Sequence, residues 1–351
     1  MATKETSNMW REIHEQPEAV RNCIEKNRDV MKSIAEQVKQ RDIKTVVFAA
    51  RGSSDHACLV ARYVFEIYCG MVASIACPSV VTQYSNTMDY SNVLLIGVSQ
   101  SGGAADVYEV MKKCHEEGGV CVSITNVRDS LMTKTGSFYM NNECGPELSI
   151  TAAKSYLTQT AMLIGIAAYI SGNDELMDLL TRLPDIVAHS MELESQVESI
   201  LPIYRNVEHL MIYGRGYLAA LGMETELKIQ ETSYLDARCY ASSDYRHGPI
   251  ATAQRFVPCI FFIADKETNK GVIELHQRLK EEKKIYSTIV TNDKEIAAMG
   301  DTSVLISGDC DGLAAVFPCA VFSQMFACLC SMSRGYNPDN PDGVSKNTVT
   351  I

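Results

Sequence analysis

The sequence has 351 residues, 46% of them hydrophobic and 21% charged, which is typical of a globular protein with room for two domains. Its formal net charge of −11 argues against a nucleic-acid partner, because that requires clustered Lys and Arg. No apolar run reaches the length of a membrane span and the first residues contain no apolar signal core, so we expect no membrane association and a cytoplasmic location. The 13 cysteines lack the spacing of metal sites and the 7 histidines do not cluster, so we expect free thiols, no metal and no cofactor.

The first part of the chain alternates helical patterns with short apolar runs. Residues 7–40 are polar with a helical period, and another helical pattern covers 55–68. The runs between such patterns predict strands at 44–50, 72–77, 93–98, 120–125 and 137–140. Continuous apolar strands that alternate with helices predict a mostly parallel sheet covered on both faces. The apolar stretch 161–170 is interpreted as a buried helix.

The same order of elements recurs in the second part of the chain. The run His209–Gly214, followed by an Arg-Gly pair, repeats the signature of Val46–Ala50 and the Arg-Gly pair after it. A helix is predicted at 218–234 and strands at 237–240, 258–263, 285–291 and 303–306. The repetition indicates an internal duplication. We therefore predict a helical arm (1–40), a first domain (41–195), a second domain (196–330) and an irregular tail (331–351).

Two loops of small residues directly follow predicted strands of the first domain. Their residues are Gly52, Ser53 and Ser54 in the first loop, and Ser99, Gln100, Ser101, Gly102 and Gly103 in the second. Each loop precedes a predicted helix, and the free amides and hydroxyls at a helix N-terminus suit a phosphate dianion. Such residues also serve as turn formers and helix caps, but two loops at the strand ends of one sheet favour a ligand site. Neither loop carries a nucleotide-binding fingerprint.

The helix predicted at 218–234 carries three charged residues on one face. Glu224, Lys228 and Glu231 are spaced at i, i+4 and i+7. By itself this spacing is more typical of an exposed salt-bridge ladder. The next run, however, contains His247 directly before Gly-Pro, a rigid turn that can hold an imidazole in a fixed place. The combination favours a second interpretation, in which these residues transfer protons.

Carboxylate, imidazole and amine side chains match aldose–ketose chemistry better than hydride transfer or hydrolysis. Moving a proton between adjacent sugar carbons needs a carboxylate base. Opening a cyclic hemiacetal needs an acid–base group at the ring oxygen, which an imidazole supplies. A lysine either forms an iminium with the sugar carbonyl or stabilises the developing enolate oxygen.

On these motifs the chain resembles the SIS (sugar isomerase) domain family over nearly its whole length. In particular it is similar to the isomerase half of glucosamine-6-phosphate synthase and to SIS-type glucosamine-6-phosphate deaminases. The resemblance implies an α/β fold of two tandem SIS domains, each a three-layer αβα sandwich with a mostly parallel five-stranded sheet. The motifs that carry it are Met9–Pro17, Arg51–Ala57, Ser99–Gly102, Glu147–Ser155, Glu224–Glu231, His247–Pro249 and Asn337–Lys346.

The resemblance also implies a phosphosugar substrate and a role for each site residue. Glu231 would move the proton between carbons 1 and 2, His247 would open the ring, and the tail residue Lys346 would reach the sugar carbonyl. In the family the histidine comes from the partner subunit, which implies a homodimer. The supporting and substrate-binding residues would be Lys228, Glu224, Gly52, Ser53, Ser54, Ser99, Gln100 and Ser101, with Ile150 and Ala152 in the segment that closes over the sugar.

The chain departs from the family pattern at three positions. Gly103 and Ala104 stand where the synthase has an acidic residue and a threonine, and Ala152 replaces a serine. One phosphate-binding hydroxyl is therefore missing, and the exact sugar stays open. Because the sequence has no glutaminase domain before the helical arm, we expect deamination of glucosamine 6-phosphate to fructose 6-phosphate and ammonia. A deglycase of a 6-phosphorylated Amadori compound, another phosphosugar isomerase and a non-catalytic phosphosugar sensor remain alternatives.

Overall fold

The computed structural model describes residues 2–84 and 88–346. The chain forms two compact units, each built around its own five-stranded sheet. The first-sheet unit comprises Glu15–Glu147, Lys154–Pro184 and Ser345–Ile351. The second-sheet unit comprises Met1–His14, Leu148–Ala153 and Asp185–Val344. Each unit therefore combines segments that are distant in the sequence.

The sheet of the first-sheet unit is entirely parallel, in the strand order β2-β1-β3-β4-β5. Its strands are β1 (Thr45–Ala49), β2 (Val72–Ile75), β3 (Leu94–Val98), β4 (Val120–Thr125) and β5 (Phe138–Asn141). Its helical elements are α2 (Gln16–Gln40), α3 (Ser53–Cys69), α4 (Pro78–Thr82), α5 (Ala105–Glu116), η1 (Met132–Lys134) and α6 (Lys154–Ser171), and it contains the first part of α7 (Asp174–Ser190). The five predicted strands are confirmed within a few residues, since β-branched apolar runs fit a sheet buried on both faces.

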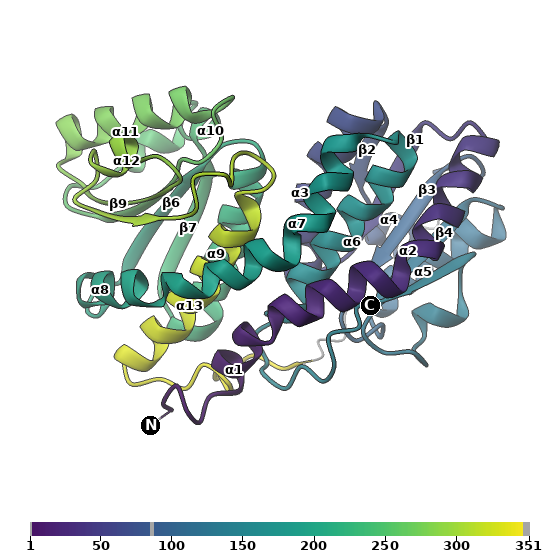
Figure 1. Cartoon of the computed structure of the whole chain (residues 1–351), viewed down its shortest axis with the longest axis horizontal. Helices are drawn as coiled ribbons and strands as arrows, with labels where there is room; N and C mark the ends of the chain where they lie inside the picture. Colours follow the sequence, from purple (N-terminus) through teal and green to yellow (C-terminus); the bar gives the residue numbers. More distant parts are fainter. Residues whose placement is uncertain (1, 85–87, 347–351) are drawn as a thin grey trace. The chain divides into compact units, whose positions relative to one another are not determined.

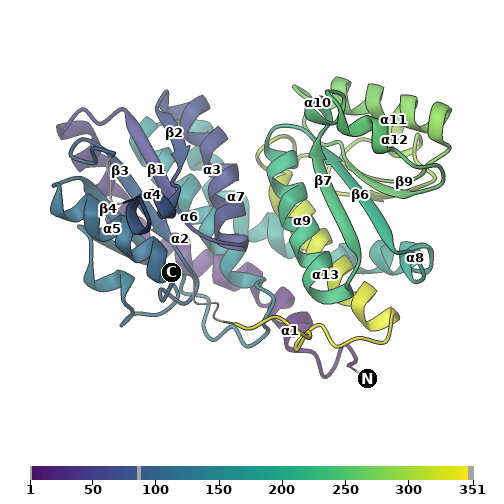
Figure 2. The same ribbon diagram turned by 180° about the vertical axis from the view of Figure 1, so that it is seen from behind.

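Helices cover both faces of this sheet (Figure 1). Alternate residues of β1 point to opposite faces. On one face Phe48 packs against Phe65 of α3, with ring centroids 5.5 Å apart. On the other face Val47 belongs to a buried cluster with Val110 and Met111 of α5. The view from behind in Figure 2 brings α4 and α5 forward, and the layers are those of an αβα sandwich.

The second-sheet unit repeats this plan, with a parallel sheet in the order β10-β9-β8-β6-β7. Its strands are β6 (His209–Gly214), β7 (Asp236–Ala241), β8 (Pro258–Phe262), β9 (Tyr286–Thr291) and β10 (Thr302–Leu305). Its helical elements are α1 (Asn8–His14), η2 (Met191–Leu193), α8 (Glu194–Tyr204), α9 (Tyr217–Ser233), α10 (Ser242–Tyr245), η3 (Pro249–Thr252), α11 (Asn269–Lys283), α12 (Lys294–Ala297) and α13 (Val316–Ser333). Phe262 meets Phe322 of α13 on one face, and Phe261 packs with Leu275 of α11 on the other.

The two sheets have the same topology, so the internal duplication expected from the sequence is present in the fold. The first strand of each half, β1 or β6, lies between the second and third strands of that half. The turn after this strand is also repeated. Gly52 has φ 56° and ψ −134° before α3, and Gly216 has φ 57° and ψ −131° before α9. Positive φ is costly for residues with a Cβ atom, which explains glycine at both positions.

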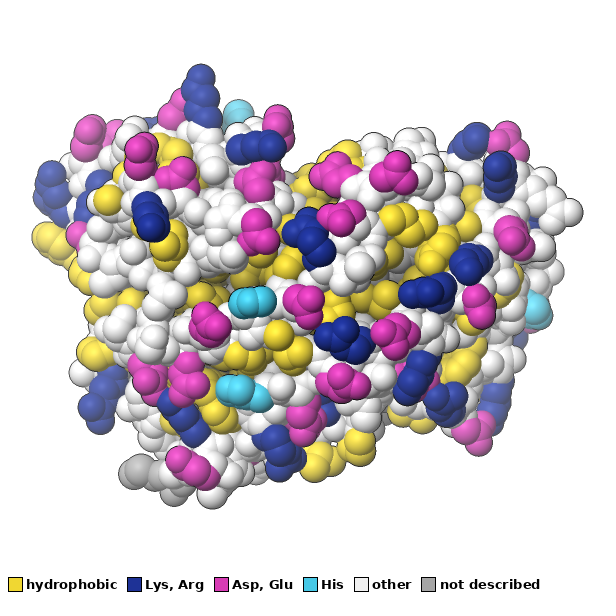
Figure 3. Space-filling view, in the orientation of Figure 1, with side chains coloured by type: hydrophobic (Ala, Val, Ile, Leu, Met, Phe, Trp, Pro, Cys, Tyr) yellow, Lys and Arg dark blue, Asp and Glu magenta, His cyan; other side chains and the backbone are white. Residues whose placement is uncertain are grey.

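Two observations on composition bear on the expectations above. Helix α13 is long and apolar enough to cross a membrane, but 89% of it is buried inside the structure, as expected of the central helix of a domain. All 13 cysteines are free thiols, and Cys77 is the exposed one, which confirms the expectation of free cysteines. On the face shown in Figure 3, acidic and basic side chains are interspersed.

Candidate functional site

The two small-residue loops follow neighbouring strands at the same edge of the first sheet. β1 and β3 are adjacent and parallel, with Ala49 beside Gly97, so both chains leave the sheet at its carboxyl edge, where ligands bind in open α/β folds. The first loop leads through Gly52 into α3. In the described part of the chain, the amides of Ser53 and Ser54 donate to no acceptor. The N-terminus of α3 therefore offers two free N–H donors to a ligand.

The second loop is fixed through its backbone. The carbonyl of Gln100 accepts from the amide of Asn126 at 3.0 Å and from the hydroxyl of Thr125 at 3.2 Å. Gly102 has φ 63°, and a Cβ atom there would lie 2.2 Å from the hydroxyl of Ser130. The side chains of Ser99, Gln100 and Ser101 are half-buried. Backbone anchoring of this kind leaves the loop side chains able to contact a ligand.

An ion pair that the sequence analysis missed joins the two loops. Arg51, just before Gly52, donates from Nε to Oδ2 of Asp106 at 2.8 Å, and its Nη2 lies 2.6 Å from the same oxygen. Asp106 is in the first turn of α5, directly after the second loop. Arg51 and Asp106 are 55 positions apart in the sequence. The only feature of the sequence that pointed to this ion pair was an acidic residue in the first turn of a predicted helix.

The three charged residues of α9 form a largely buried ion-pair cluster. Nζ of Lys228 lies 2.9 Å from Oε2 of Glu231 and 3.5 Å from Oε1 of Glu224. The side chains of Lys228 and Glu224 are each 1% exposed, whereas that of Glu231 is 20% exposed. The exposed-ladder interpretation of this helical face is therefore wrong. Of the three residues, Glu231 is the one whose carboxylate a ligand can reach.

The burial of this cluster has a local cause. α9 packs against both the second sheet and α13, and hydroxyl groups bond it to α13. Thr225 Oγ1 lies 2.7 Å from the hydroxyl of Ser323, and Thr232 Oγ1 donates to the carbonyl of Ala327 at 3.1 Å. Two carboxylates around one ammonium are tolerated there because each charge has an opposite partner.

His247 lies apart from this cluster in the turn between α10 and η3 of the same unit. Its amide donates to the carbonyl of Asp244 at 3.0 Å, and Gly248 with φ 143° follows it. The side chain is exposed, and its imidazole makes no hydrogen bond with the residues that the structure describes. The turn therefore presents an imidazole outward from its own unit.

The segment 148–153, predicted to close over the sugar, is held by two side chains of the second-sheet unit. The buried carboxylate of Glu12 in α1 accepts from the amides of Leu148 and Ser149. Gln324 of α13 donates to the carbonyl of Ala153 at 3.2 Å. Ile150 and Ala152 are half-buried, between neighbours that are buried. Buried and half-buried residues thus alternate along this segment, as they do in an extended chain with one accessible side. Ile150 and Ala152, the two predicted contact residues, both lie on that accessible side.

The tail residue Lys346 contacts a buried carboxylate of the first-sheet unit. Its Nζ lies 3.5 Å from Oε2 of Glu147, whose side chain is 0% exposed. The carboxylate of Glu147 also accepts from the hydroxyl of Ser155 at 2.7 Å and from its amide at 2.9 Å. Hydrogen bonding of this kind fixes the carboxylate, and with it the position of the tail amine.

The preceding part of the tail is tied to the second-sheet unit. Oδ1 of Asp339 accepts from the hydroxyl of Ser7 at 2.9 Å and from the amide of Met9 at 2.8 Å, so the tail caps α1 from a distant part of the sequence. The amide of Asp342 donates to the hydroxyl of Tyr234, at the end of α9, at 2.7 Å. The predicted irregular tail is thus ordered by specific contacts up to this point.

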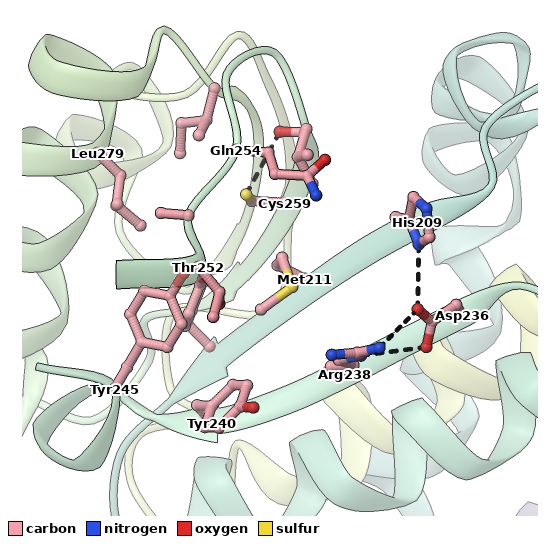
Figure 4. Close-up of a pocket in the computed structure, with 14 residues that line it drawn as sticks. His209, Met211, Asp236, Arg238, Tyr240, Tyr245, Thr252, Gln254, Cys259 and Leu279 are labelled. Atoms are coloured by element: carbon pink, nitrogen blue, oxygen red, sulfur yellow. Dashed lines mark hydrogen bonds and ion pairs between the residues drawn. The ribbon is translucent and has the colours of Figure 1, made fainter. Parts of the chain in front are cut away.

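A pocket of about 120 Å³ lies against β6 and β7 in the second-sheet unit. Figure 4 shows His209, Asp236 and Arg238 joined at one end of it and Tyr240, Tyr245 and Thr252 at the other. Hydrogen bonds from Arg238 and His209 lower the pKa of Asp236, which favours a charged rim. The pocket contains none of the predicted site residues, although the His247 turn adjoins its wall. In the described part of the chain, no three His, Cys, Asp or Glu side chains are grouped so as to hold a metal ion.

The structure thus divides the predicted residues between the units. The first-sheet unit holds the two serine loops and Lys346, and the second-sheet unit holds the α9 cluster, His247 and the segment with Ile150 and Ala152. The loops are neighbours in one sheet, and Glu224, Lys228 and Glu231 contact one another. The residues that sequence reasoning missed are Arg51, Asp106, Glu147 and Glu12.

Comparison with known proteins relates the chain to one family. A family model described as the SIS domain matches residues 39–168 and 203–310. The glutamine–fructose-6-phosphate aminotransferase (isomerizing) of Thermococcus kodakarensis is 26% identical over 354 residues, which cover 98% of this chain and 58% of that protein. The chain therefore spans somewhat more than half the length of this relative.

Solved structures are similar over nearly the whole chain. A protein assigned as a phosphosugar isomerase from Silicibacter pomeroyi DSS-3 has a TM-score of 0.83 and 26% identity, covering 95% of this chain and 100% of its own. Glucosamine-6-phosphate deaminase of Thermotoga maritima has a TM-score of 0.75 and 20% identity, covering 98% of this chain and 100% of its own. At 20% identity, the similarity to the Thermotoga maritima protein establishes a shared fold.

Proposed function

The chain belongs to the SIS domain family, and on that premise we propose that it is an enzyme that moves a proton between carbons 1 and 2 of a sugar 6-phosphate. The observation that carries this proposal is the α9 cluster. A buried ammonium holds two carboxylates, and only the one on Glu231 is partly exposed among the three side chains. A carboxylate that removes a proton from a sugar carbon must be held in a fixed position and must also be accessible to the substrate.

The loops at the carboxyl edge of the first sheet are proposed to bind the 6-phosphate. Unsatisfied amides of Ser53 and Ser54 and the hydroxyls of Ser99 and Ser101 provide neutral donors. A phosphate dianion gains from such donors at helix N-termini without requiring a strongly basic surface. This is compatible with the net charge of −11.

The proposed reaction converts glucosamine 6-phosphate and water to fructose 6-phosphate and ammonia. His247 opens the ring by proton transfer at the ring oxygen. Glu231 then removes the proton from carbon 2 of the open aldose, and Lys346 stabilises the negative charge on the oxygen of carbon 1. The oxygen of carbon 1 then takes a proton from the Lys346 ammonium, and Glu231 returns its proton to carbon 1, which leaves a protonated imine at carbon 2. Water adds there, ammonia leaves as the carbon–nitrogen bond breaks, and the remaining proton returns to Lys346.

We propose further that two copies of the chain share each site, with His247 supplied by the partner. The exposed imidazole supports this, because it has no hydrogen-bond partner in the described part of its own chain. Phe256, in the segment between η3 and β8, is 72% exposed, and a large apolar side chain of this kind is suited to an interface. A second copy that covers this segment would bury the phenyl ring.

Purified protein is expected to release ammonia from glucosamine 6-phosphate and to form an equal amount of fructose 6-phosphate, without added cofactor. The measurement couples ammonia to glutamate dehydrogenase and the ketose to phosphoglucose isomerase. The same assay with a 6-phosphorylated Amadori compound and with other aldose and ketose 6-phosphates tests the alternatives. Turnover of one of those compounds in place of the amino sugar would reassign the substrate. Phosphosugar binding with no turnover of any would support a sensor.

Shared sites are expected to produce complementation between two inactive variants. His247→Ala and Glu231→Gln protomers each lack one group, so a mixed dimer contains one site with both groups intact. Random exchange of equal amounts should restore about a quarter of wild-type activity, since half the dimers are mixed and half their sites are complete. The measurement is activity after subunit exchange, with exchange followed by mass spectrometry of tagged protomers. Complete exchange without recovery would contradict a shared site.

A further inference from the structure

The ion pair between Arg51 and Asp106 links the start of the first serine loop to the helix that follows the second, and it fixes the Arg51 guanidinium there. Arg51 follows β1 and Asp106 follows the loop after β3, and these strands are neighbours. The side chain of Asp106 is 3% exposed, whereas that of Arg51 is 54% exposed. The carboxylate is thus buried, and the cation that it holds stays open to a ligand.

The contacts of this pair leave part of the guanidinium available. Nε and Nη2 both point to Oδ2 of Asp106, and Oδ1 of Asp106 accepts from the amide of Val107 at 2.9 Å. Among the described residues, Nη1 of Arg51 has no acceptor. An arginine offers five N–H donors in a planar fork, so a second anion can bind at the free side while the carboxylate keeps the fork in place.

The end of the second loop lacks a side-chain donor at the position that precedes α5. Ala104, at the N-cap of α5, makes no side-chain capping bond, so this position offers a phosphate no hydroxyl group. A charged N–H donor to a phosphate oxygen is stronger than a neutral hydroxyl. Arg51 can therefore supply from the first loop what the second loop lacks.

We propose that Arg51 binds the phosphate of the substrate through Nη1, and that Asp106 is a positioning residue that holds Arg51 in the orientation required. This inference rests on the proposed function, since it assigns a further residue to the phosphate site. Because the phosphate takes no part in the bond changes, the contact is equally strong in the ground state and the transition state. Losing it raises KM and leaves kcat nearly unchanged.

The test is to measure, by calorimetry, the dissociation constants of fructose 6-phosphate and of inorganic phosphate for the Arg51→Gln variant. We expect the dissociation constants of both to rise about 10- to 100-fold. Arg51→Lys keeps the charge but loses the fork, so it should fall between the glutamine variant and wild type. Asp106→Asn should weaken binding by a smaller factor than Arg51→Gln, because the arginine is retained but less firmly held. The matched control is Arg41→Gln, before β1 at the opposite edge of the same sheet, with wild-type affinities expected.

The outcomes separate this inference from the proposed function. Wild-type protein that binds fructose 6-phosphate, together with Arg51→Gln that binds it equally well, overturns the role of Arg51 and leaves the proposed function intact. Wild-type protein that binds neither fructose 6-phosphate nor inorganic phosphate overturns the proposed function itself. If Arg51→Gln does not fold, as judged by circular dichroism, the lysine variant decides. Wild-type affinity in that variant overturns the proposal, and a loss of affinity for both phosphate compounds supports it.

Discussion

Glu231→Gln is expected to lower turnover of the phosphosugar substrate by about 100-fold or more while leaving its binding nearly unchanged. The amide is almost the same size as the carboxylate, but it cannot take a proton from carbon 2. Its carbonyl oxygen can still accept the hydrogen bond that Lys228 donates to Glu231 at 2.9 Å. The measurements are kcat from ammonia release and the dissociation constant of fructose 6-phosphate by calorimetry.

The matched control is the same change at Glu226, on another face of α9. Glu226 accepts from the amide of Cys239 at 2.8 Å and from Gln230 at 3.1 Å, and it has no contact with the Lys228 cluster in the described structure. Glu226→Gln is expected to keep turnover within about threefold of wild type, because it alters no group near the proposed base. Equal turnover in wild type and Glu231→Gln would show that another group moves the proton.

Lys228→Met is expected to reduce the free energy of unfolding by about 3–5 kcal/mol, since it removes the ammonium that lies 3.5 Å from the buried carboxylate of Glu224. The side chain of Glu224 is 1% exposed, so solvent cannot replace the ammonium. Adding Glu224→Gln to this variant removes the buried negative charge and should restore part of the loss, because Glu231 is 20% exposed and can be hydrated. Urea unfolding followed by circular dichroism measures all three variants.

A pair of the same spacing at the C-terminal end of α5 provides the control. Lys113 and Glu117 are also i, i+4 partners, but their side chains are 26% and 31% exposed. Lys113→Met should cost no more than about 1 kcal/mol, because exposed ion pairs contribute little. A similar small cost for Lys228→Met would mean that the α9 cluster is not maintained by its charges.

Much of the fold could be predicted from local sequence pattern. The run 120–125 is a predicted strand and is observed as Val120–Thr125, and the helix predicted at 218–234 is observed as Tyr217–Ser233. A buried parallel strand requires consecutive apolar residues, and a strand-to-helix turn with positive φ requires glycine. These requirements act over a few residues, so the sequence records them directly.

The charged face of α9 shows where local pattern stops being informative. The spacing of Glu224, Lys228 and Glu231 places them on one side of a helix, and it is the same for a solvated ladder and for a buried cluster. The difference is made by α13, about 95 positions away in the sequence, where Ser323 and Ala327 bond to α9. Burial depends on what packs against a helix, and no residue within the helix specifies that.

The amino-acid sequence by itself determined the strands, the duplicated order of elements, and the two loops with their small residues, because each depends on the conformation of a short segment. Only the tertiary structure decided that Arg51 meets Asp106, that Lys346 meets Glu147, and which carboxylate of α9 stays accessible. These contacts join residues brought together by strand order and helix packing. Their energies come from burial and charge pairing across the folded chain, which the spacing of residues along it does not encode.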